Sequence, residues 1–247
     1  MSGCNGKMGQ VITKLSSQFD GLKIVAGYDK NDAVKNPYPV FTDLKDCDVD
    51  IDVVIDFSHP SAFNSVLDFA VSRRVALVMA TTGLSQANVK SLEDASSVIP
   101  VFFSSNMSLG VNLVVDLVKK AAKVLEDNFD IEIIELHHNQ KIDAPSGTAL
   151  TIADAINSVL HQKRDYVFDR HSRRKKRSKG EIGIHSIRGG TIVGEHSVIF
   201  AGNDEIIEIK HTATSKEVFG IGALKAAAFV VSKEPGLYSM KDLVENI

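Results

Sequence analysis

The chain has 247 residues, of which 44% are hydrophobic, and a formal net charge of −3. This size and composition predict a globular protein that can bury the core of one large domain or two modest ones. The weak negative charge gives no general reason to bind nucleic acid or an anionic membrane, and no apolar run approaches the roughly 18 to 20 residues of a membrane span.

The chain begins with a glycine-rich loop, Gly3-Cys4-Asn5-Gly6-Lys7-Met8-Gly9, which runs into an apolar-periodic helix. Such a loop lets the backbone approach a pyrophosphate at the positive end of the helix. The motif alone is weak, because glycine-rich turns are common and this spacing differs from the usual fingerprint. Residues 22–28 predict the next strand, and Asp29 ends it about twenty residues after the last glycine, where a carboxylate meets an adenosine ribose. Without the glycines, Asp29 would equally suit an ordinary turn.

Few residues precede the glycine loop, since only Met1 and Ser2 stand before Gly3. A dinucleotide loop normally follows a central parallel strand, and each buried N–H or C=O left unpaired by its loss costs on the order of 1 to 3 kcal/mol. We therefore expect that the functional protein has about five to eight more apolar residues ahead of this start. The alternative is a rearranged sheet in which another segment fills the gap. No basic-then-apolar secretory leader is seen, and Cys4 and Cys47 form no redox or zinc pattern, which favours the cytoplasm.

Strands and helices then alternate. This rhythm predicts a Rossmann-like, doubly wound parallel sheet that binds its ligand at the carboxyl ends of the strands. The segments that carry it are the strands 52–57, 75–79 and 101–103 and the helices 60–73 and 85–95. The chain is expected to change domain near residues 107–108.

The most informative stretch follows in the middle of the chain and reads Glu135-Leu136-His137-His138-Asn139-Gln140-Lys141-Ile142-Asp143-Ala144-Pro145-Ser146-Gly147-Thr148-Ala149. Residues 129–136 alternate polar and β-branched side chains, which predicts a strand, and 148–160 have helical apolar spacing. The alternation places Glu135 and His137 on one side and His138 on the other. One histidine can therefore face chemistry while its neighbour faces a ligand.

Three interpretations of this stretch remain open from the residues alone. In the first, Lys141 delivers a proton or holds a carboxylate, and the helix start near Ser146, Gly147 and Thr148 binds a second carboxylate. In the second, the stretch is an ordinary strand end and turn, which would be favoured for any one of these residues alone. A metal site at Glu135 and the two histidines ranks below both, because adjacent strand residues do not easily converge on one ion.

A basic cluster at 170–179 and three further strands complete the second half of the chain. A solvated loop is favoured for most of these charges, although the cluster could also concentrate an anionic substrate; an RNA-binding role is disfavoured because no aromatic residues interleave. Strands at 182–188, 194–201 and 205–212 would join the strand before His137 in an open, roughly four-stranded sheet.

The run from Glu135 to Ala149 closely resembles the signature E-x-H-H-x-x-K-x-D-A-P-S-G-T-A of the dihydrodipicolinate (4-hydroxy-tetrahydrodipicolinate) reductase family. A match of this length is highly specific. The resemblance extends through Ile-Gly-Ile-His-Ser-Ile-Arg-Gly-Gly and the ending Gly-Leu-Tyr-Ser-Met-Lys-Asp, so it spans nearly the whole chain. Departures are Ala80, Met107 and Lys216, where the family often has Gly, Phe and Arg.

The resemblance implies an α/β enzyme with a dinucleotide-binding domain of residues 1–107 and 215–247 and an inserted α+β domain, 108–214, for substrate binding and oligomerisation. We expect the site in the cleft between the domains. By resemblance, NADPH or NADH reduces 4-hydroxy-tetrahydrodipicolinate to tetrahydrodipicolinate in diaminopimelate and lysine biosynthesis. The implied partners are a small dicarboxylate substrate and other copies of the chain in a homotetramer, with no metal, nucleic acid or membrane.

The resemblance also assigns roles to individual residues. His137 is the general acid/base, suited by an imidazole reference pKa near roughly 6.5, and Lys141 is a second proton donor and carboxylate partner. The substrate carboxylates are assigned to His138, Ser146, Gly147 and Thr148. The cofactor-binding candidates are Gly3, Cys4, Asn5, Gly6, Lys7, Met8, Asp29, Lys30, Ala80, Thr81, Thr82, Ser104, Ser105, Asn106 and Met107.

Two other function classes are compatible with parts of the pattern. An oxidoreductase of the semialdehyde dehydrogenase kind would need a nucleophilic cysteine in the second domain, but neither cysteine lies beyond Cys47. A non-catalytic dinucleotide sensor could keep the glycine loop and Asp29. It would not need His137 and Lys141 together.

Overall fold

The computed structural model describes residues 1–246, and the chain divides into two compact units. One unit combines Met1–Leu109 with the segment from Lys216 onward, and the other is Gly110–Ser215. Within the described residues, every helix is too short or too polar to cross a membrane.

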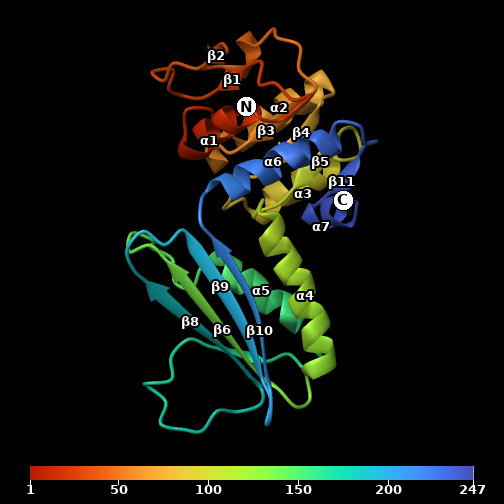
Figure 1. Ribbon diagram of the computed structural model, residues 1–247. Coiled ribbons are helices and arrows are strands. Elements are labelled where there is room, and N and C mark those ends of the chain that lie inside the picture. The colour runs from red at the N-terminus through yellow and green to blue at the C-terminus, as the bar shows by residue number, and fades with distance from the viewer. Residues whose placement is uncertain (247) are drawn as a thin grey trace. The chain divides into compact units, whose positions relative to one another are not determined.

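The first unit is an α/β layer structure around a parallel sheet with strand order β11-β5-β4-β3. Its strands are β3 (Val53–Asp56), β4 (Ala76–Met79), β5 (Pro100–Phe103) and β11 (Gly236–Tyr238). The helical elements are α1 (Lys7–Ser16), η1 (Leu44–Asp46), η2 (Pro60–Ala62), α2 (Phe63–Arg73), α3 (Gln86–Ala95), α6 (Glu217–Val230) and α7 (Met240–Glu245) (Figure 1).

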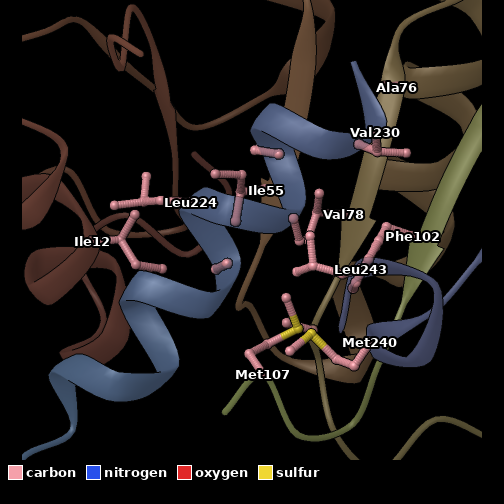
Figure 2. Packing of buried hydrophobic residues seen from close by; sticks show 14 of the residues in the cluster. Ile12, Ile55, Ala76, Val78, Phe102, Met107, Leu224, Val230, Met240 and Leu243 are labelled. Carbon is pink, nitrogen blue, oxygen red and sulfur yellow. The ribbon is translucent and has the colours of Figure 1, made fainter. Parts of the chain in front are cut away.

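Both faces of this sheet are buried, as the continuous apolar runs of its strands predict. Val78 and Phe102 pack in a cluster with residues of α1 and α6, whereas Leu77 and Val101 pack with residues of α2 and α3. Figure 2 shows α6 lying over Ile55, Val78 and Phe102 from three neighbouring strands. The predicted Rossmann-like, doubly wound fold is therefore confirmed.

The parallel sheet is interrupted beside β3. The strands β1 (Gly27–Tyr28) and β2 (Val40–Phe41) form a separate two-stranded sheet, and in the described chain Ser2 alone bridges the two parts by pairing with Tyr28 and Asp56. A strand over 22–28 was predicted, but residues 22–26 are not strand in the structure. The reason is that no described segment runs between these residues and β3, so the alternative of a rearranged sheet is not observed.

The second unit is built on a mixed sheet with order β10-β9-β6-β8-β7. The strands are β6 (Asp130–His137), β7 (Asp165–Val167), β8 (Glu181–Arg188), β9 (Gly194–Ala201) and β10 (Ile206–Ala213). β6 lies centrally, parallel to β8 and antiparallel to β9. The sheet has a fifth strand beyond the roughly four expected, because β7 is too short for its three residues to show an alternating pattern.

Two helices, α4 (Leu109–Leu125) and α5 (Gly147–Asn157), pack on one face of the second sheet (Figure 1). Val118 and Ile152 from these helices join Ile133 and Phe200 from the strands in one buried cluster. The opposite face carries exposed apolar side chains, including Ile206 at 70% exposure. Among the described residues, α4 and α5 therefore cover one face of this sheet, and the other face keeps apolar side chains open to solvent.

Gly222 of α6 offers a test of packing in the first unit. A Cβ atom there would lie 1.7 Å from the backbone oxygen of Met107. Ala normally stabilises a helix by roughly 0.5–1 kcal/mol relative to Gly, but overpacking costs about 1–3 kcal/mol or more. We expect Gly222→Ala to lower the free energy of unfolding in urea.

Gly220→Ala in the same helix is the matched control, because its Cβ would meet the side chains of Leu15, Val11 and Ile12, which can shift. It should lose less stability than Gly222→Ala. Equal stability of the two variants would contradict the packing argument.

Candidate active site

The centre of the second unit's polar site is the Glu135 carboxylate near the end of β6, whose side chain is 0% exposed. It accepts hydrogen bonds from His137 Nδ1 at 2.5 Å, from the two terminal nitrogens of Arg188 at 2.7 and 2.8 Å, and from the Ser146 N–H at 3.1 Å. A buried carboxylate is costly unless it is paired in this way. Three elements, β6, β8 and the start of α5, are therefore held at one point.

The protonation states follow from these contacts. Burial raises the pKa of Glu135, but hydrogen bonds from Arg188 and the neighbouring donors outweigh it and lower the pKa to about 2. Burial lowers the pKa of His137, and Glu135 offsets part of that effect. At neutral pH, Glu135 is ionised and His137 is neutral with its Nδ1–H donated to the carboxylate, because a carboxylate can only accept. Nε2 of His137 is then the atom that can take up a proton.

A second histidine, His196 on β9, lies beside His137 and was missed from the sequence. The two rings meet edge to face with centroids 5.3 Å apart, and His196 Nε2 lies 3.0 Å from Ser146 Oγ. Burial, followed by the charge of His137, lowers the pKa of His196 to about 4. Ser146 in turn caps α5 by accepting the Ala149 N–H at 3.2 Å. The neutral His196 thus helps to fix the start of that helix.

Two further residues of this site, Arg188 and Gly194, were also not anticipated. A Cβ atom on Gly194 would lie 3.1 Å from His137 Nε2, so glycine leaves space beside the reactive nitrogen. A signal for Arg188 was present in the sequence. Glu135 lies on the inward side of an apolar strand, where a carboxylate requires a cation, and Arg188 ends a neighbouring strand. Which cation it would be depends on the β6–β8 register, in which His137 pairs with Arg188.

Lys141 lies in the loop after β6 and forms an ion pair with Asp143 at 2.7 Å. The Lys141 hydrogen bond is the main reason that the pKa of Asp143 is lowered, and the Gly147 N–H also donates to this carboxylate. A carboxylate is therefore held between Lys141 and the first residue of α5. Thr148 in the first turn of α5 and His138 just after β6 are both half-buried.

The glycine loop of the first unit has the geometry expected of an anion site. Gly3 has a φ of +73°, and a Cβ there would lie 2.7 Å from the Phe57 oxygen. A Cβ on Gly9 would lie 2.2 Å from the Gly3 oxygen. The helix α1 starts after Gly6 with no side-chain cap and no acidic residue in its first turn, so its positive end is suited to a phosphate.

Asp29 anchors this loop. Its carboxylate accepts the N–H of Asn5 at 3.0 Å and that of Asn31 at 3.2 Å. The neighbouring Lys30 places its ammonium 3.2 Å from the hydroxyl of Ser61. A polar network through Gln10, which donates to the Cys4 oxygen at 2.8 Å, was not anticipated. The other loop candidates, Lys7 and Met8, lie in the first turn of α1.

The remaining cofactor candidates lie at or after the carboxyl ends of β4 and β5. The Thr81 hydroxyl donates to buried Asp56 at 2.6 Å, and the Ser104 hydroxyl donates to the Asn106 oxygen at 2.8 Å. Ala80 is buried, whereas Thr82 and Ser105 are exposed. The Met107 side chain is buried in the core near Met240 (Figure 2).

The basic cluster at 170–179 is partly bound to the sheet instead of being fully solvated. Arg177 contacts Asp130 at 2.6 Å and Glu132 at 2.9 Å, and Arg170 contacts Glu132 at 2.5 Å and Glu181 at 3.0 Å. Two of the arginines therefore clamp the loop onto β6 and β8.

Comparisons with known proteins agree with this arrangement. The model of the dihydrodipicolinate reductase N-terminus matches residues 1–107, and that of the C-terminus matches residues 110–244. The chain belongs to the dihydrodipicolinate reductase family. The resemblance found in the run from Glu135 to Ala149 is thereby confirmed.

Two relatives support the same family, and a solved structure shares the fold. A 4-hydroxy-tetrahydrodipicolinate reductase from Caldanaerobacter subterraneus subsp. tengcongensis is 56% identical over 244 residues, covering 99% of this chain and 96% of the relative. The enzyme of the same name from Clostridium novyi is 49% identical, covering 100% and 97%. A dipicolinate-bound dihydrodipicolinate reductase from Paenisporosarcina sp. TG-14 shares the fold, with a TM-score of 0.83 at 24% identity and coverage of 100% and 97%.

The pairing of His137 with Glu135 gives a titration prediction. The charge and hydrogen bond of Glu135 raise the pKa of His137, so Glu135→Gln should shift the His137 titration to lower pH. NMR of the imidazole Cε1–H signal against pH measures the shift.

Glu126→Gln is the control, because Glu126 forms a similar contact with the Nδ1 of another histidine, His161, at 2.7 Å. It should leave the His137 titration in place. An unchanged titration in Glu135→Gln would show that the carboxylate does not set the charge state of His137.

Proposed function

We propose that the chain catalyses the NAD(P)H-dependent reduction of 4-hydroxy-tetrahydrodipicolinate to tetrahydrodipicolinate, in the biosynthesis of diaminopimelate and lysine. The observation that carries the proposal is the Glu135–His137 pair beside the Lys141–Asp143 pair at the start of α5, in a chain that is 56% identical to a reductase of this name. We also propose that the protein works in the cytoplasm.

His137 and Lys141 supply the proton-transfer groups of the proposed reaction. Once a ring carbon of the substrate has been reduced, the resulting enamine-like species must gain a proton. A protonated His137 Nε2 can give one, because the imidazolium is stabilised by Glu135 through Nδ1 and the neutral form is readily restored. Lys141 is the second donor, and its ammonium also offsets substrate charge.

The anionic groups of the substrate match the start of α5. The carboxylate of Asp143 already takes hydrogen bonds from Lys141 and Gly147, so this place accommodates an anion of that shape. We propose that a substrate carboxylate uses Lys141 together with Ser146, Gly147 and Thr148, and that His138 contacts the second one. The Paenisporosarcina relative was solved with dipicolinate, a planar dicarboxylate, which supports a substrate of this class.

The residues of the first unit fit a nicotinamide dinucleotide. The backbone of Gly3 to Met8 and the uncapped start of α1 would hold the pyrophosphate, and Asp29 and Lys30 would lie by the adenosine ribose. The loops at Ala80 to Thr82 and Ser104 to Met107 are assigned to the nicotinamide half. When bound, the dinucleotide would supply the two electrons for reduction.

Two rival classes lose support from the described residues. A cysteine-dependent oxidoreductase would need a reactive thiolate near His137, but Cys4 and Cys47 are both buried in the first unit. A dinucleotide sensor would leave the buried ionic cluster at Glu135 without a purpose.

We propose that the chain forms a homotetramer. The face of the second sheet opposite α4 and α5 carries Ile187 and Ile206, which are 46% and 70% exposed, and association would remove this apolar surface from water.

Replacement of the proton-transfer groups tests the proposed function. His137→Gln and Lys141→Ala should each lower kcat by roughly two or more orders of magnitude, the scale of a lost proton-transfer group. The affinity for NADPH, measured by fluorescence, should barely change. Near-native turnover of both variants in steady-state oxidation of NADPH with the substrate would remove the assigned roles.

The adenosine site gives a second test. Asp29 can accept hydrogen bonds from ribose hydroxyls but repels a 2′-phosphate, whereas Lys30 attracts one, so we expect use of both cofactors without a large preference. Asp29→Ala should weaken the binding of both cofactors by loosening the loop, and the affinity for NADH should fall more than that for NADPH. Lys30→Ala should lower the affinity for NADPH more than that for NADH. Equal losses of both cofactors in both variants, measured as dissociation constants, would take these residues out of the adenosine site.

A further inference from the structure

The segment 29–39, which joins β1 to β2, contains neither helix nor strand. The strands β1 and β2 are parallel, and the connection between parallel strands is usually a helix that packs on the sheet. This segment is held on α1 instead. The hydroxyl of Tyr38, a residue that is 8% exposed, lies 2.6 Å from the Thr13 hydroxyl of α1. We call residues 29–39 the strap.

Three side-chain amides join the strap to the glycine loop. Gln10 Nε2 of α1 donates to Asn36 Oδ1 of the strap at 2.9 Å, and Asn36 Nδ2 donates to Asn5 Oδ1 of the loop at 2.7 Å. Asn5 Nδ2 then donates to the backbone oxygen of Asn31, near the start of the strap. The three residues that carry these amides are half-buried. They form one continuous set of hydrogen bonds, which we call the amide chain.

Backbone oxygens fix the direction of the amide chain. Each of its three nitrogens donates to one of them, namely those of Cys4 at 2.8 Å, Val34 at 3.2 Å and Asn31. A backbone oxygen only accepts hydrogen bonds, so the nitrogen end of each amide must face it. Turning any one amide over would bring two acceptors together and leave polar groups unmatched, which costs the desolvation penalty of each. The amide chain therefore favours one arrangement.

The amide chain holds the middle of the glycine loop, just before α1. Asn5 is fixed through its backbone by Asp29, which accepts its N–H at 3.0 Å, and through its side chain by Asn36. The backbone oxygen of Cys4 is fixed by Gln10. A loop whose backbone N–H groups are already held in place binds an anion more tightly, because less conformational freedom is lost when the ligand arrives. The strap therefore acts on the loop at two adjacent residues.

We propose that Asn36 and Gln10 are positioning residues for the pyrophosphate of the nicotinamide dinucleotide. They act without touching the ligand, because they fix Cys4 and Asn5 and so the backbone that leads into the positive end of α1. The inference rests on the proposed function for the identity of the ligand. The pyrophosphate is common to NADH and NADPH, so the amide chain acts on both equally, unlike the residues at the adenosine ribose.

The test compares Asn36→Ala, Gln10→Ala and the double variant with the unsubstituted chain. Tyr38→Phe is the matched control, because it removes a hydrogen bond between the strap and α1 and leaves the amide chain intact. Dissociation constants are measured for NADH, NADPH, ADP-ribose, which keeps the pyrophosphate, and adenosine 2′-monophosphate, which lacks it. Thermal melts check that each variant is folded, and the use of two single variants keeps the test available if one of them unfolds.

We expect Asn36→Ala and Gln10→Ala each to raise the dissociation constants of NADH, NADPH and ADP-ribose by roughly three- to tenfold, the scale of one hydrogen bond to a partly buried group. The factor should be the same for these three ligands, and the dissociation constant of adenosine 2′-monophosphate should change little. The double variant should lose less affinity than the two single losses combined, because both break the same chain of hydrogen bonds. Tyr38→Phe should bind all four ligands as the unsubstituted chain does.

Unchanged dissociation constants of ADP-ribose in both single variants would overturn the proposal. An equal loss of affinity for ADP-ribose and adenosine 2′-monophosphate would also overturn it, because the two residues would then support the fold of the whole unit. The same holds for an equal loss in Tyr38→Phe, because attachment of the strap alone would explain it.

Oxidation of NADPH with the substrate tests the proposed function separately. If the unsubstituted chain binds ADP-ribose but does not reduce 4-hydroxy-tetrahydrodipicolinate, the proposed function is wrong, and the affinity ratios still decide the role of the amide chain. Failure of the unsubstituted chain to bind any dinucleotide would overturn both proposals.

Discussion

The burial of one carboxylate, that of Glu135, is the constraint on which the second unit's site depends. An ionised group without exposure to water must be matched by charge and hydrogen bonds, and Glu135 takes them from Arg188 on β8, His137 on β6 and the backbone at the start of α5. Loss of any partner would leave a buried charge partly uncompensated. Because its folded pKa, about 2, lies below the ordinary value of 4.5, the stability that it contributes is present above pH 4.5 and is lost as pH falls toward 2.

The same cluster sets the chemistry. Glu135 fixes the tautomer of His137 and so decides that Nε2 is the reactive atom, while Arg188 keeps Glu135 from competing for the proton. Burial, Lys141 and Arg188 all lower the pKa of His137, whereas Glu135 raises it. This balance suits a group that must both accept and give a proton. Burial also keeps His196 neutral, because it lowers the pKa of that histidine to about 4, and His196 holds Ser146 in place.

The sequence predicted the features that depend on local periodicity. Alternation along β6 placed Glu135 and His137 on one face, and the helix signals around Ser146 placed the start of α5 within a residue. It could not identify Arg188 or His196, because both reach the site across strands whose register is set by tertiary pairing. Met107 stands in the loop that the family resemblance assigns to the cofactor, and the burial of its side chain in the core was not visible from the sequence. Of the strand predicted over 22–28, only β1 (Gly27–Tyr28) forms, because in the described chain residues 22–26 have no strand paired beside them.

The interrupted sheet bears on the dinucleotide loop itself. The loop begins at Gly3, whose positive φ and contact with Phe57 require the backbone before it to lie fixed between Tyr28 and Ile55. That position now rests on the few hydrogen bonds of Met1, Ser2 and Gly3, one of them made by a terminal amino group that burial disfavours in its charged form. The order of the anion-binding loop therefore depends on how firmly residues 1–3 are held between Tyr28 and Ile55.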